Sequence, residues 1–452
     1  MTRATVTIAA HFMVDVFSFV GVSLLPLLAV TLDLRTEQKA LLLALGSLCS
    51  GAVQPVVAWA SDRYDTRAIG TAGMLVAVLC ISSLGLADSF GMLALLFCLG
   101  AAGVGAFHPP AAATVGRLGG ANRSKYIAFF FLAGMVGGMV GNLTIPRFVA
   151  VMTPMTENGP ATEVGLRSLL WFIPIGLLGA YFLARSIHPV GHRHHGDGER
   201  HVSWDRAERR RRWGAVWILY IANTMRFSVN MALVYLLVEW TGEVVMLKND
   251  AAAMTDTLGL KASQLNGVLQ ASMQVGMGGM GIVLGLVLAA RYEKLVFVAL
   301  PMLGSIALFM IPRTAMISES LMVPFAIFAT VLTGVGFGAV IPVSISLAQR
   351  LLPHRTSLAS GLMLGGAWML AFVGPLLAEL VHKGLDEKPN TPPGLIRALG
   401  SLPDSVSTPL IEGLGLTAGF TVMAAVLFFA GLIALLLPAV QQAREAARRT
   451  QC

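Results

Sequence analysis

Twelve apolar stretches, each long enough to cross a lipid bilayer, divide this chain and limit the folds open to it. A spanning helix needs roughly 20 apolar residues. Charged residues make up only 12% of the chain, against about 25% in a typical soluble domain. We therefore expect an all-α polytopic membrane protein. The expected spans are residues 5–31, 38–60, 68–87, 90–117, 125–152, 167–187, 214–240, 264–290, 293–312, 319–351, 356–381 and 414–438.

The Lys and Arg residues predict how these spans are oriented. The net charge is +8, but the basic residues gather in alternate connecting segments rather than in one nucleic-acid-binding patch. If both chain ends lie inside, most of the 32 Lys and Arg residues also lie inside, as the positive-inside rule requires. We expect a multi-pass monomer in the bacterial inner membrane with cytoplasmic termini, surrounded by the lipid bilayer and without a nucleic-acid partner.

The chain divides into two halves of six spans each. A polar segment rich in His and Arg separates them, and the halves share residues at a constant offset, so that Gly103 and Pro109 align with Gly336 and Pro342. A parallel repeat of this kind implies two bundles that rock around a midplane site. The expected divisions are a bundle over 1–188, a cytoplasmic linker over 189–213, a second bundle over 214–438 and a basic tail over 439–452.

The loop after the second span carries a recognisable motif. Residues 58–67 read Ala-Trp-Ala-Ser-Asp-Arg-Tyr-Asp-Thr-Arg, in which Asp62, Arg63 and Arg67 occupy the acidic and basic positions. This loop resembles the one between helices 2 and 3 of the major facilitator superfamily. The resemblance implies that these three residues belong to a loop that takes part in the conformational change between the two halves.

A narrower resemblance covers residues 10–145. His11 and Asp15, the Gln-Pro-Val-Val at 54–57, and the Phe-His-Pro at 107–109 occur in that order. Together they resemble the fosmidomycin-resistance branch of the superfamily, and Arg226 early in the seventh span is also similar to that branch. The resemblance implies a proton-driven exporter of small toxic compounds, including antibiotics.

Three ionisable residues in the first half are candidates for proton coupling. His11 and Asp15 are four apart and share a helix face, and His108 precedes Pro109 in the fourth span. Intramembrane acids and histidines usually mark an ion or substrate path. The alternatives are a structural hydrogen-bonded pair for His11 and Asp15, and a histidine that satisfies carbonyls freed by the prolines. Ile341 aligns with His108, so we expect the repeat to share a helix break at the proline but not the histidine.

Arg226 is the one cation deep within an expected span. We assign it, with Asn230 on the same helix, to substrate binding. Because the seventh span is the repeat mate of the first, we expect Arg226 to face Asp15 across the midplane. In one interpretation Arg226 binds an anionic group of the substrate, which competes with Asp15 for pairing. In the other, Arg226 and Asp15 form a permanent ion pair that locks the bundles together.

Further polar and small residues complete the expected site. Asn266, Gln270 and Gln274 repeat every four residues and line either a hydrated cavity or an interhelical contact. Gln270 and Gln274 are assigned to substrate binding. The residues assigned to close packing and gating between helices are Gly134, Gly138, Gly141, Gly374 and Pro375.

These patterns favour a secondary transporter that exports a small polar, anionic toxicant by alternating access, with protons as the second partner. The alternatives are a permease that imports a small anionic metabolite and, third, a membrane-embedded enzyme. The chain has no Gly-x-Ser-x-Gly, nucleotide-binding loop or zinc signature, so we expect no enzyme activity, no cofactor and no metal site. The spacing of the linker histidines matches no defined metal site.

Overall fold

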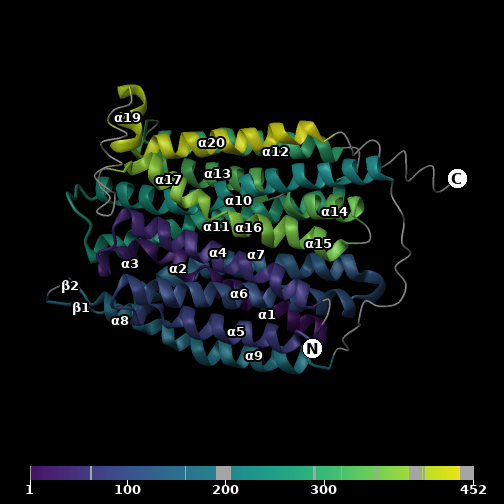
Figure 1. Cartoon of the computed structure of the whole chain (residues 1–452). Coiled ribbons are helices and arrows are strands. Elements are labelled where there is room, and N and C mark those ends of the chain that lie inside the picture. The colour runs from purple at the N-terminus through teal and green to yellow at the C-terminus, as the bar shows by residue number, and fades with distance from the viewer. Residues whose placement is uncertain are drawn as a thin grey trace.

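The protein is a bundle of long helices that run in roughly the same direction (Figure 1). The computed structural model describes residues 2–61, 64–157, 159–189, 205–288, 292–316, 318–338, 340–352, 355–385, 400 and 403–437. The chain begins at one end of the bundle, here called the terminal end. A short two-stranded hairpin, β1 (Met155–Thr156) and β2 (Gly159–Pro160), lies at the other end, here called the hairpin end.

The N-terminal half contains six long helical segments, several of them made of consecutive short helices. Besides the hairpin, its elements are α1 (Arg3–Ser18), α2 (Val20–Ser23), α3 (Leu25–Thr31), α4 (Thr36–Ser61), α5 (Arg67–Ser82), η1 (Leu84–Leu86), α6 (Phe90–Leu118), η2 (Gly120–Asn122), α7 (Arg123–Val151), α8 (Thr162–Arg167), η3 (Ser168–Trp171) and α9 (Phe172–Ile187).

The C-terminal half is built in the same way, with a π-helical turn, η6, inside its fifth span. Its elements are α10 (Arg206–Lys248), α11 (Asp256–Val287), α12 (Glu293–Met310), η5 (Ile311–Met316), α13 (Glu319–Gly338), α14 (Ile341–Leu351), α15 (Thr356–Gly361), η6 (Leu362–Gly366), α16 (Ala367–Leu370), α17 (Val373–Lys383), α19 (Asp404–Ile411), α20 (Leu416–Ile433) and η7 (Ala434–Leu436).

Twelve helical segments in the described part of the chain are long and apolar enough to cross a membrane, which confirms the expected number. The seventh segment differs most from expectation, because α10 extends from Arg206 to Lys248 rather than over 214–240. Asp205 caps its start by accepting a hydrogen bond from the Glu208 N–H, which explains the early beginning. Since α10 also ends late, at Lys248, and α11 begins at Asp256, much of the connection between the seventh and eighth expected spans is helical.

The expected break at the shared proline occurs in only one half. The helix α6 continues through Pro109 and Pro110, whereas α13 ends at Gly338 and α14 begins at Ile341, next to Pro342. The prediction of a common helix break was therefore wrong for the N-terminal half. A proline removes one intrahelical hydrogen bond, and neighbouring groups can compensate for that loss in a transmembrane bundle.

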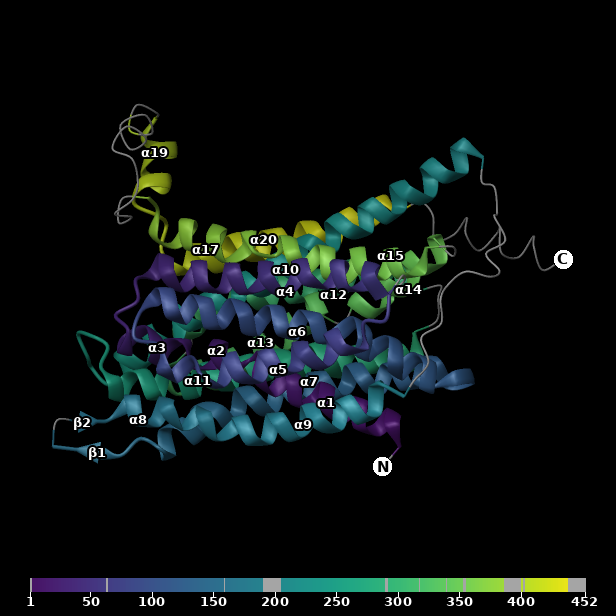
Figure 2. The same cartoon turned by 60° about the horizontal axis from the view of Figure 1, so that its bottom comes forward.

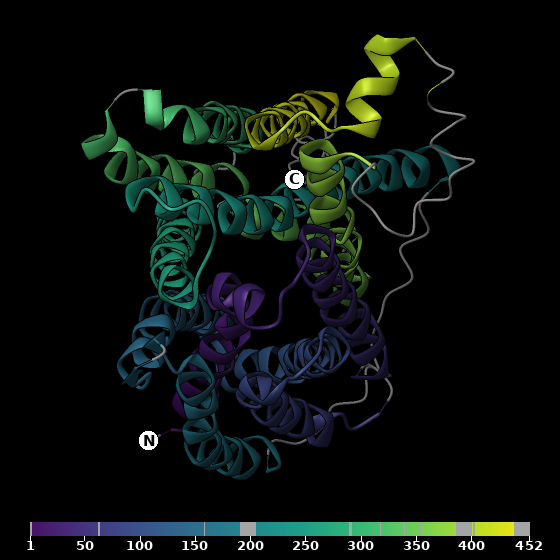
Figure 3. The ribbon, with the colours of Figure 1, turned by 90° about the vertical axis from the view of Figure 1, so that its left-hand side faces the viewer.

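The two halves form separate bundles that meet along two seams. Figure 3 looks along the helices from the hairpin end and shows the N-terminal half, in purple and blue, below the C-terminal half, in teal to yellow. In one seam α7 packs along α11, and in the other α4 packs along α16 and α17. The outward faces carry large apolar side chains that are more than half exposed, such as Leu295, Ile306 and Phe328, as expected for surfaces that contact lipid.

Candidate functional site

His11, Asp15 and His108 lie together inside the N-terminal bundle, and we call them the triangle. Asp15 follows His11 by one turn of α1, and His108 reaches them from α6. The His11 Nε2 atom lies 3.1 Å from His108 Nε2 and 3.5 Å from Asp15 Oδ2. His108 Nε2 lies 3.6 Å from Asp15 Oδ1. The structure therefore brings together all three residues predicted for proton coupling.

Hydrogen bonds to the backbone orient the two imidazole rings of the triangle. His11 Nδ1 is 2.6 Å from the Phe130 carbonyl oxygen, and His108 Nδ1 is 2.7 Å from the Val104 carbonyl oxygen. A carbonyl oxygen only accepts, so each Nδ1 carries a hydrogen. A neutral ring would then offer only a lone pair at Nε2. The contact between the two Nε2 atoms is therefore a hydrogen bond only when the pair holds one additional proton, next to the Asp15 carboxylate.

The surroundings of the triangle exclude most water. The His11 ring stacks on Phe130 with ring centroids 3.8 Å apart, and Phe107 and Phe131 approach its other sides. The His11 side chain is only 2% exposed, whereas Asp15 and His108 are 17% and 21% exposed. A charge shared by the triangle is thus partly shielded, with access from the side of Asp15 and His108.

Gly134 of α7 leaves room for the triangle. A Cβ atom at this position would lie 2.5 Å from both Asp15 Oδ2 and His11 Cε1. Such a separation is too short for non-bonded atoms, so any larger residue would displace the carboxylate or the imidazole. Among the glycines predicted to allow close helix packing, Gly134 is therefore the one whose missing side chain forms part of the site.

His108 does not repair the carbonyls that the prolines free. Pro109 and Pro110 lack the N–H groups that would otherwise bond to the carbonyls of Gly105 and Ala106. The acceptor of the His108 ring is instead Val104. The alternative in which His108 satisfies the carbonyls freed by the prolines therefore does not hold in this structure, and its role in proton coupling stays a prediction.

Arg226 lies in a different part of the protein. Its side chain is 1% exposed, and its Nη1 atom donates to Asn223 Oδ1 over 3.0 Å. Its Nη2 atom lies 3.5 Å from the carbonyl oxygens of Phe297 in α12 and Ala430 in α20. The guanidinium therefore points into the C-terminal bundle. The expected pair with Asp15 does not form in this structure, because Asp15 pairs with the two histidines of its own bundle.

A family model described as the Major Facilitator Superfamily matches residues 7–385. The chain belongs to the major facilitator superfamily. It is thus a multi-pass membrane protein and a secondary transporter of small molecules, and not an enzyme. The expected fold and the expected membership of this superfamily are both confirmed.

Solved structures of other transporters share the superfamily fold. A bacterial homologue of the human lysosomal transporter Spinster, in an inward-facing and occupied conformation, matches with a TM-score of 0.65 and 16% identity over 96% of each chain. A bacterial homologue of the human drug peptide transporters PepT1 and PepT2 matches with a TM-score of 0.66 and 13% identity, over 98% of this chain and 99% of that one. At these identities the likeness concerns the fold alone.

A curated relative gives the narrower similarity. The fosmidomycin resistance protein of Escherichia coli (strain K12) is 27% identical to this chain over 176 residues. The match covers 39% of this chain and 40% of the length of that relative. A distant, partial similarity to this branch of the superfamily is therefore shown, as the motifs between residues 10 and 145 predicted.

The polar face of α11 lies at a seam of the superfamily fold. Asn266 Nδ2 donates to the Val22 carbonyl oxygen in the other bundle over 2.9 Å, and Gln270 Nε2 donates to Asn266 Oδ1 over 3.3 Å. Gln274 is buried against Gly138 of α7. Asn266 thus serves as an interhelical contact in this conformation. The substrate-binding role of Gln270 and Gln274 stays a prediction.

The other predicted substrate residue, Asn230, is also buried. Its Nδ2 atom lies 3.9 Å from the sulfur of Met273 and 3.8 Å from that of Met277, both on α11. These weak contacts satisfy the amide poorly, because a thioether is a poor acceptor. Asn230 and Arg226 are therefore near neighbours on α10 but have separate partners, and a shared substrate-binding role remains a prediction.

The motif loop is described only in part. Asp62 and Arg63 lie outside the described residues. Arg67, at the start of α5, donates to the Asp65 carboxylate through Nε over 2.7 Å and to the carbonyl oxygen of His188 through Nη1. The loop is thereby joined to the end of α9 within the N-terminal bundle. Its role in the conformational change stays a prediction.

The remaining predicted packing residues lie where helices approach closely. A Cβ atom at Gly138 would lie 2.6 Å from the Phe19 ring, and one at Gly141 would lie 2.6 Å from the Val16 carbonyl oxygen. Gly374 meets the backbone of Ser228 in the same way and, like Pro375, is buried in α17. Close packing is thus evident at these positions, and their contribution to gating remains a prediction.

A charged pair that the sequence analysis missed connects the two bundles. Lys39 Nζ at the start of α4 lies 2.5 Å from Glu239 Oε1 on α10, and both side chains are largely buried. Nearby, Tyr235 OH lies 3.1 Å from His382 Nδ1 of α17. Lys39 was missed because it lies near the end of an apolar span, where a Lys is usually a solvated anchor.

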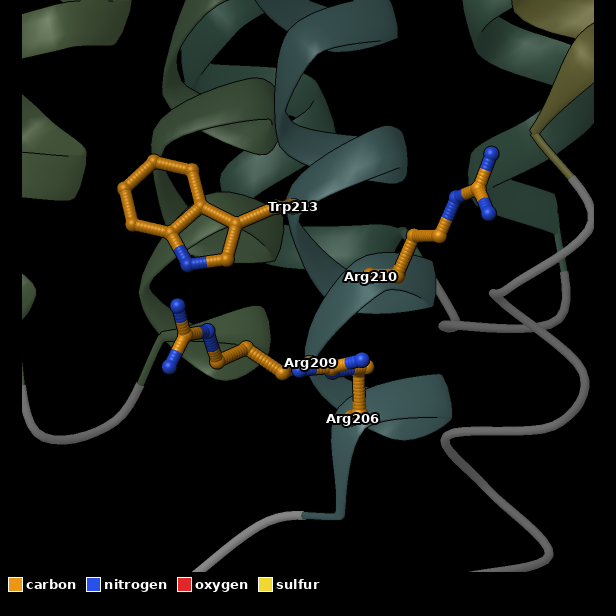
Figure 4. A pocket seen from close by; sticks show the side chains of 4 residues that line it. All are labelled: Arg206, Arg209, Arg210 and Trp213. Atoms are coloured by element: carbon orange, nitrogen blue, oxygen red, sulfur yellow. The ribbon is translucent and has the colours of Figure 1, made fainter.

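A cavity of about 510 Å³ lies at the terminal end of α10, lined by Arg206, Arg209, Arg210 and Trp213 (Figure 4). Figure 4 shows Arg209 and Trp213 on one side of the helix and Arg210 on the other. The three arginines are exposed. This basic helix end lies where the distribution of Lys and Arg predicts a cytoplasmic surface, and no triangle residue lines it.

Proposed function

We propose that this transporter exports a small polar toxic compound from the bacterial cytoplasm in exchange for protons. The observation that supports proton coupling is the triangle, in which a hydrogen bond between two Nε2 atoms requires a proton next to a carboxylate. The similarity to the fosmidomycin resistance protein supports export. We further propose the inner membrane as its location, with both termini in the cytoplasm, because the Lys and Arg residues favour that orientation.

The chain's own residues can hold and release this proton without a cofactor. Asp15 stabilises the proton between His11 and His108, and the carbonyl oxygens of Phe130 and Val104 keep both rings oriented. Loss of the proton leaves two lone pairs facing each other over 3.1 Å and an unbalanced carboxylate. The rings or the carboxylate must then find new partners, and this need couples protonation to a change in conformation.

Contacts between the two bundles gather at the hairpin end of the protein, the end at which β1 and β2 lie in Figure 2. These contacts join Leu27 to Ser263, Val22 to Asn266, Thr162 to Asp256, and Lys39 to Glu239. With the proposed orientation this end faces outward, so the conformation is closed to the outside. Buried polar atoms without partners in the described part of the seam, such as the Asn142 amide, can gain partners when the bundles move.

Import of a small anionic metabolite is the second candidate, and a growth assay separates it from export. A deletion strain and the same strain carrying the cloned gene are exposed to a panel of antibiotics and metabolites, with fosmidomycin as the first probe. Export predicts that the gene protects the cells, and that an ionophore which collapses the proton gradient removes the protection. Greater sensitivity with the gene would favour import, and protection without a gradient would contradict proton coupling.

We also propose that the exported compound is an anion. Arg226 supports this, since it is a buried cation whose Nε atom has no partner, and no carboxylate pairs with it in the described residues. An unbalanced buried charge favours binding of an opposite one. A lysine keeps the charge but loses the planar fork, so Arg226→Lys should weaken binding of the exported compound about 10-fold, and Arg226→Gln should nearly abolish it.

A binding titration of purified wild-type protein and both Arg226 variants, with the compound that the growth panel identifies, checks this result. Arg313→Gln serves as the matched control, because it removes an arginine at the hairpin end of the same bundle. If Arg226→Gln binds normally but unfolds at a lower temperature, the guanidinium is a structural tie from α10 to α12 and α20, and the anionic assignment is wrong.

His108 should be dispensable for folding but required for transport. Ile341 aligns with it in the second bundle, so His108→Ile should insert and unfold like the wild type. The substitution removes one end of the Nε2–Nε2 hydrogen bond, and we expect proton-driven transport to fall by at least about 10-fold. Expression yield, thermal unfolding and uptake into proteoliposomes test both parts. If His108→Ile fails to fold while Pro109→Ala transports normally, His108 is required for folding and the prediction is wrong.

A further inference from the structure

We propose that the triangle is also a binding site for a divalent transition-metal ion of the zinc class, and that the ion replaces the proton held between the two rings. The proposal rests on the proposed function, since it gives the proton site a second ligand. The sequence alone predicted no metal site. His108 lies far from His11 and Asp15 in the chain, and only the fold brings the three residues together.

The separations between the ligand atoms fit a tetrahedral ion. Zinc binds histidine nitrogen and carboxylate oxygen at about 2.0–2.2 Å, which places any two ligand atoms of a tetrahedron about 3.3 Å apart. In the triangle the two Nε2 atoms are 3.1 Å apart, His11 Nε2 lies 3.5 Å from Asp15 Oδ2, and His108 Nε2 lies 3.6 Å from the other oxygen, Oδ1. With one ligand atom taken from each residue, the three atoms lie within 4.8 Å of one another. A small closing movement would bring all three within bonding distance of one ion.

The hydrogen bonds behind the ligands are those that a metal-binding histidine needs. Each ring donates its Nδ1–H to a backbone carbonyl oxygen, from Phe130 for His11 and from Val104 for His108. These bonds keep the Nε2 lone pairs directed at the centre of the triangle. Metal ligands are usually oriented by such outer partners, which also raise the basicity of the ring.

The charge and access of the triangle also fit a divalent ion. The two imidazoles are neutral ligands, and the Asp15 carboxylate offsets half of the charge of a divalent ion. The aromatic side chains around His11 lower the local dielectric constant, which strengthens the attraction between the ion and the carboxylate. Asp15 and His108 are partly exposed, so a water molecule can complete a tetrahedron from that side. Binding releases the shared proton to solution, so one positive charge leaves and two arrive, and the site with the Asp15 carboxylate changes from neutral to a net charge of +1.

Cobalt(II) is a suitable probe, because its visible absorption reports four-coordinate binding. The experiment uses the full chain in detergent micelles after treatment with a chelator. The linker histidines would also bind cobalt, so the background carries alanine at five positions: His188, His192, His194, His195 and His201. We expect one Co²⁺ per chain in this background, with the absorption of a four-coordinate ion.

Substitutions in the triangle test whether this ion occupies the proposed site. In the same background, His108→Gln and Asp15→Asn should each weaken Co²⁺ binding by about 100-fold, since even an outer partner contributes 10–100-fold to metal affinity. His382→Gln is the matched control, because His382 is a buried histidine of the other bundle and should not affect binding. Size-exclusion profiles establish that each variant is folded, and two triangle variants are used in case one is not.

The result that would overturn the proposal is equal Co²⁺ affinity with and without the triangle substitutions, or no Co²⁺ binding in the background protein. Proton-driven transport is measured separately, in buffer with a chelator and then with added Zn²⁺, which should inhibit it. Normal proton coupling without Co²⁺ binding would refute only the metal site. If Co²⁺ binds at the triangle but transport does not depend on the proton gradient, only the proposal of proton coupling is refuted.

Discussion

Asp15→Asn should abolish proton-driven transport while the protein still binds and exchanges its substrate. Asp15 is the carboxylate that balances the proton between His11 and His108, and its oxygens lie 3.5 and 3.6 Å from the two Nε2 atoms. Removing one partner of a buried ion pair costs about 3–5 kcal/mol, so retention of the proton should become at least about 100-fold weaker. An asparagine keeps the shape of the side chain, and the fold should therefore survive.

Proteoliposomes distinguish the two kinds of transport. A pH gradient drives net transport, whereas labelled substrate exchanges across the membrane without one. Wild-type protein should perform both reactions, and Asp15→Asn should perform only exchange. Asp88→Asn is the control, since Asp88 is an exposed carboxylate between α5 and α6. Full gradient-driven transport by Asp15→Asn would assign proton coupling to another group.

The fold was predictable because membrane helices leave a strong signal in the sequence. Every backbone polar group in lipid must be satisfied within the helix, so twelve long apolar segments predict twelve spans. The described part of the structure has twelve candidate membrane-spanning segments, which overlap the expected spans. The boundaries of α10 were not predictable from apolar periodicity, because its first two turns are rich in arginine and its start depends on a cap at Asp205.

The triangle was only partly predictable. The spacing of His11 and Asp15 places them on one helix face, but nothing in the sequence states that α6 presents His108 to the same face. The direction of Arg226 was the largest error. Residues on two helices that are repeat mates need not point towards the same site, since a side chain follows its local partners. For Arg226 these are Asn223 and the carbonyls of α12 and α20.

The seam contacts were not predictable, because they depend on how the bundles approach each other. Lys39 and Glu239 are 200 positions apart, and each could be a solvated end of its helix. Their contact shows that the hairpin end is held by a charged pair as well as by neutral hydrogen bonds. A transporter that alternates between two conformations must break such a pair in every cycle, so its strength contributes to the balance between them.

Lys39→Glu should therefore shift the protein towards the conformation that is open at the hairpin end. The substitution places two negative charges where the ion pair now lies, 2.5 Å apart and largely shielded from water. Loss of a shielded pair costs about 3 kcal/mol, which corresponds to roughly 100-fold in the ratio of the two conformations. Spin labels at Met155 and Leu247, exposed positions in the two bundles at this end, should then move apart.

The charge-reversed double variant separates this pair from other effects of the substitution. Lys39→Glu with Glu239→Lys restores opposite charges at the same two positions, so the distance between the labels should return towards that of the wild type. The measurement uses a background in which the four cysteines are replaced by alanine. If the single variant leaves the distance unchanged, the neutral contacts of α11 with α2 and α3 hold the hairpin end without the ion pair. If the double variant stays open, lost packing rather than lost charge accounts for the shift.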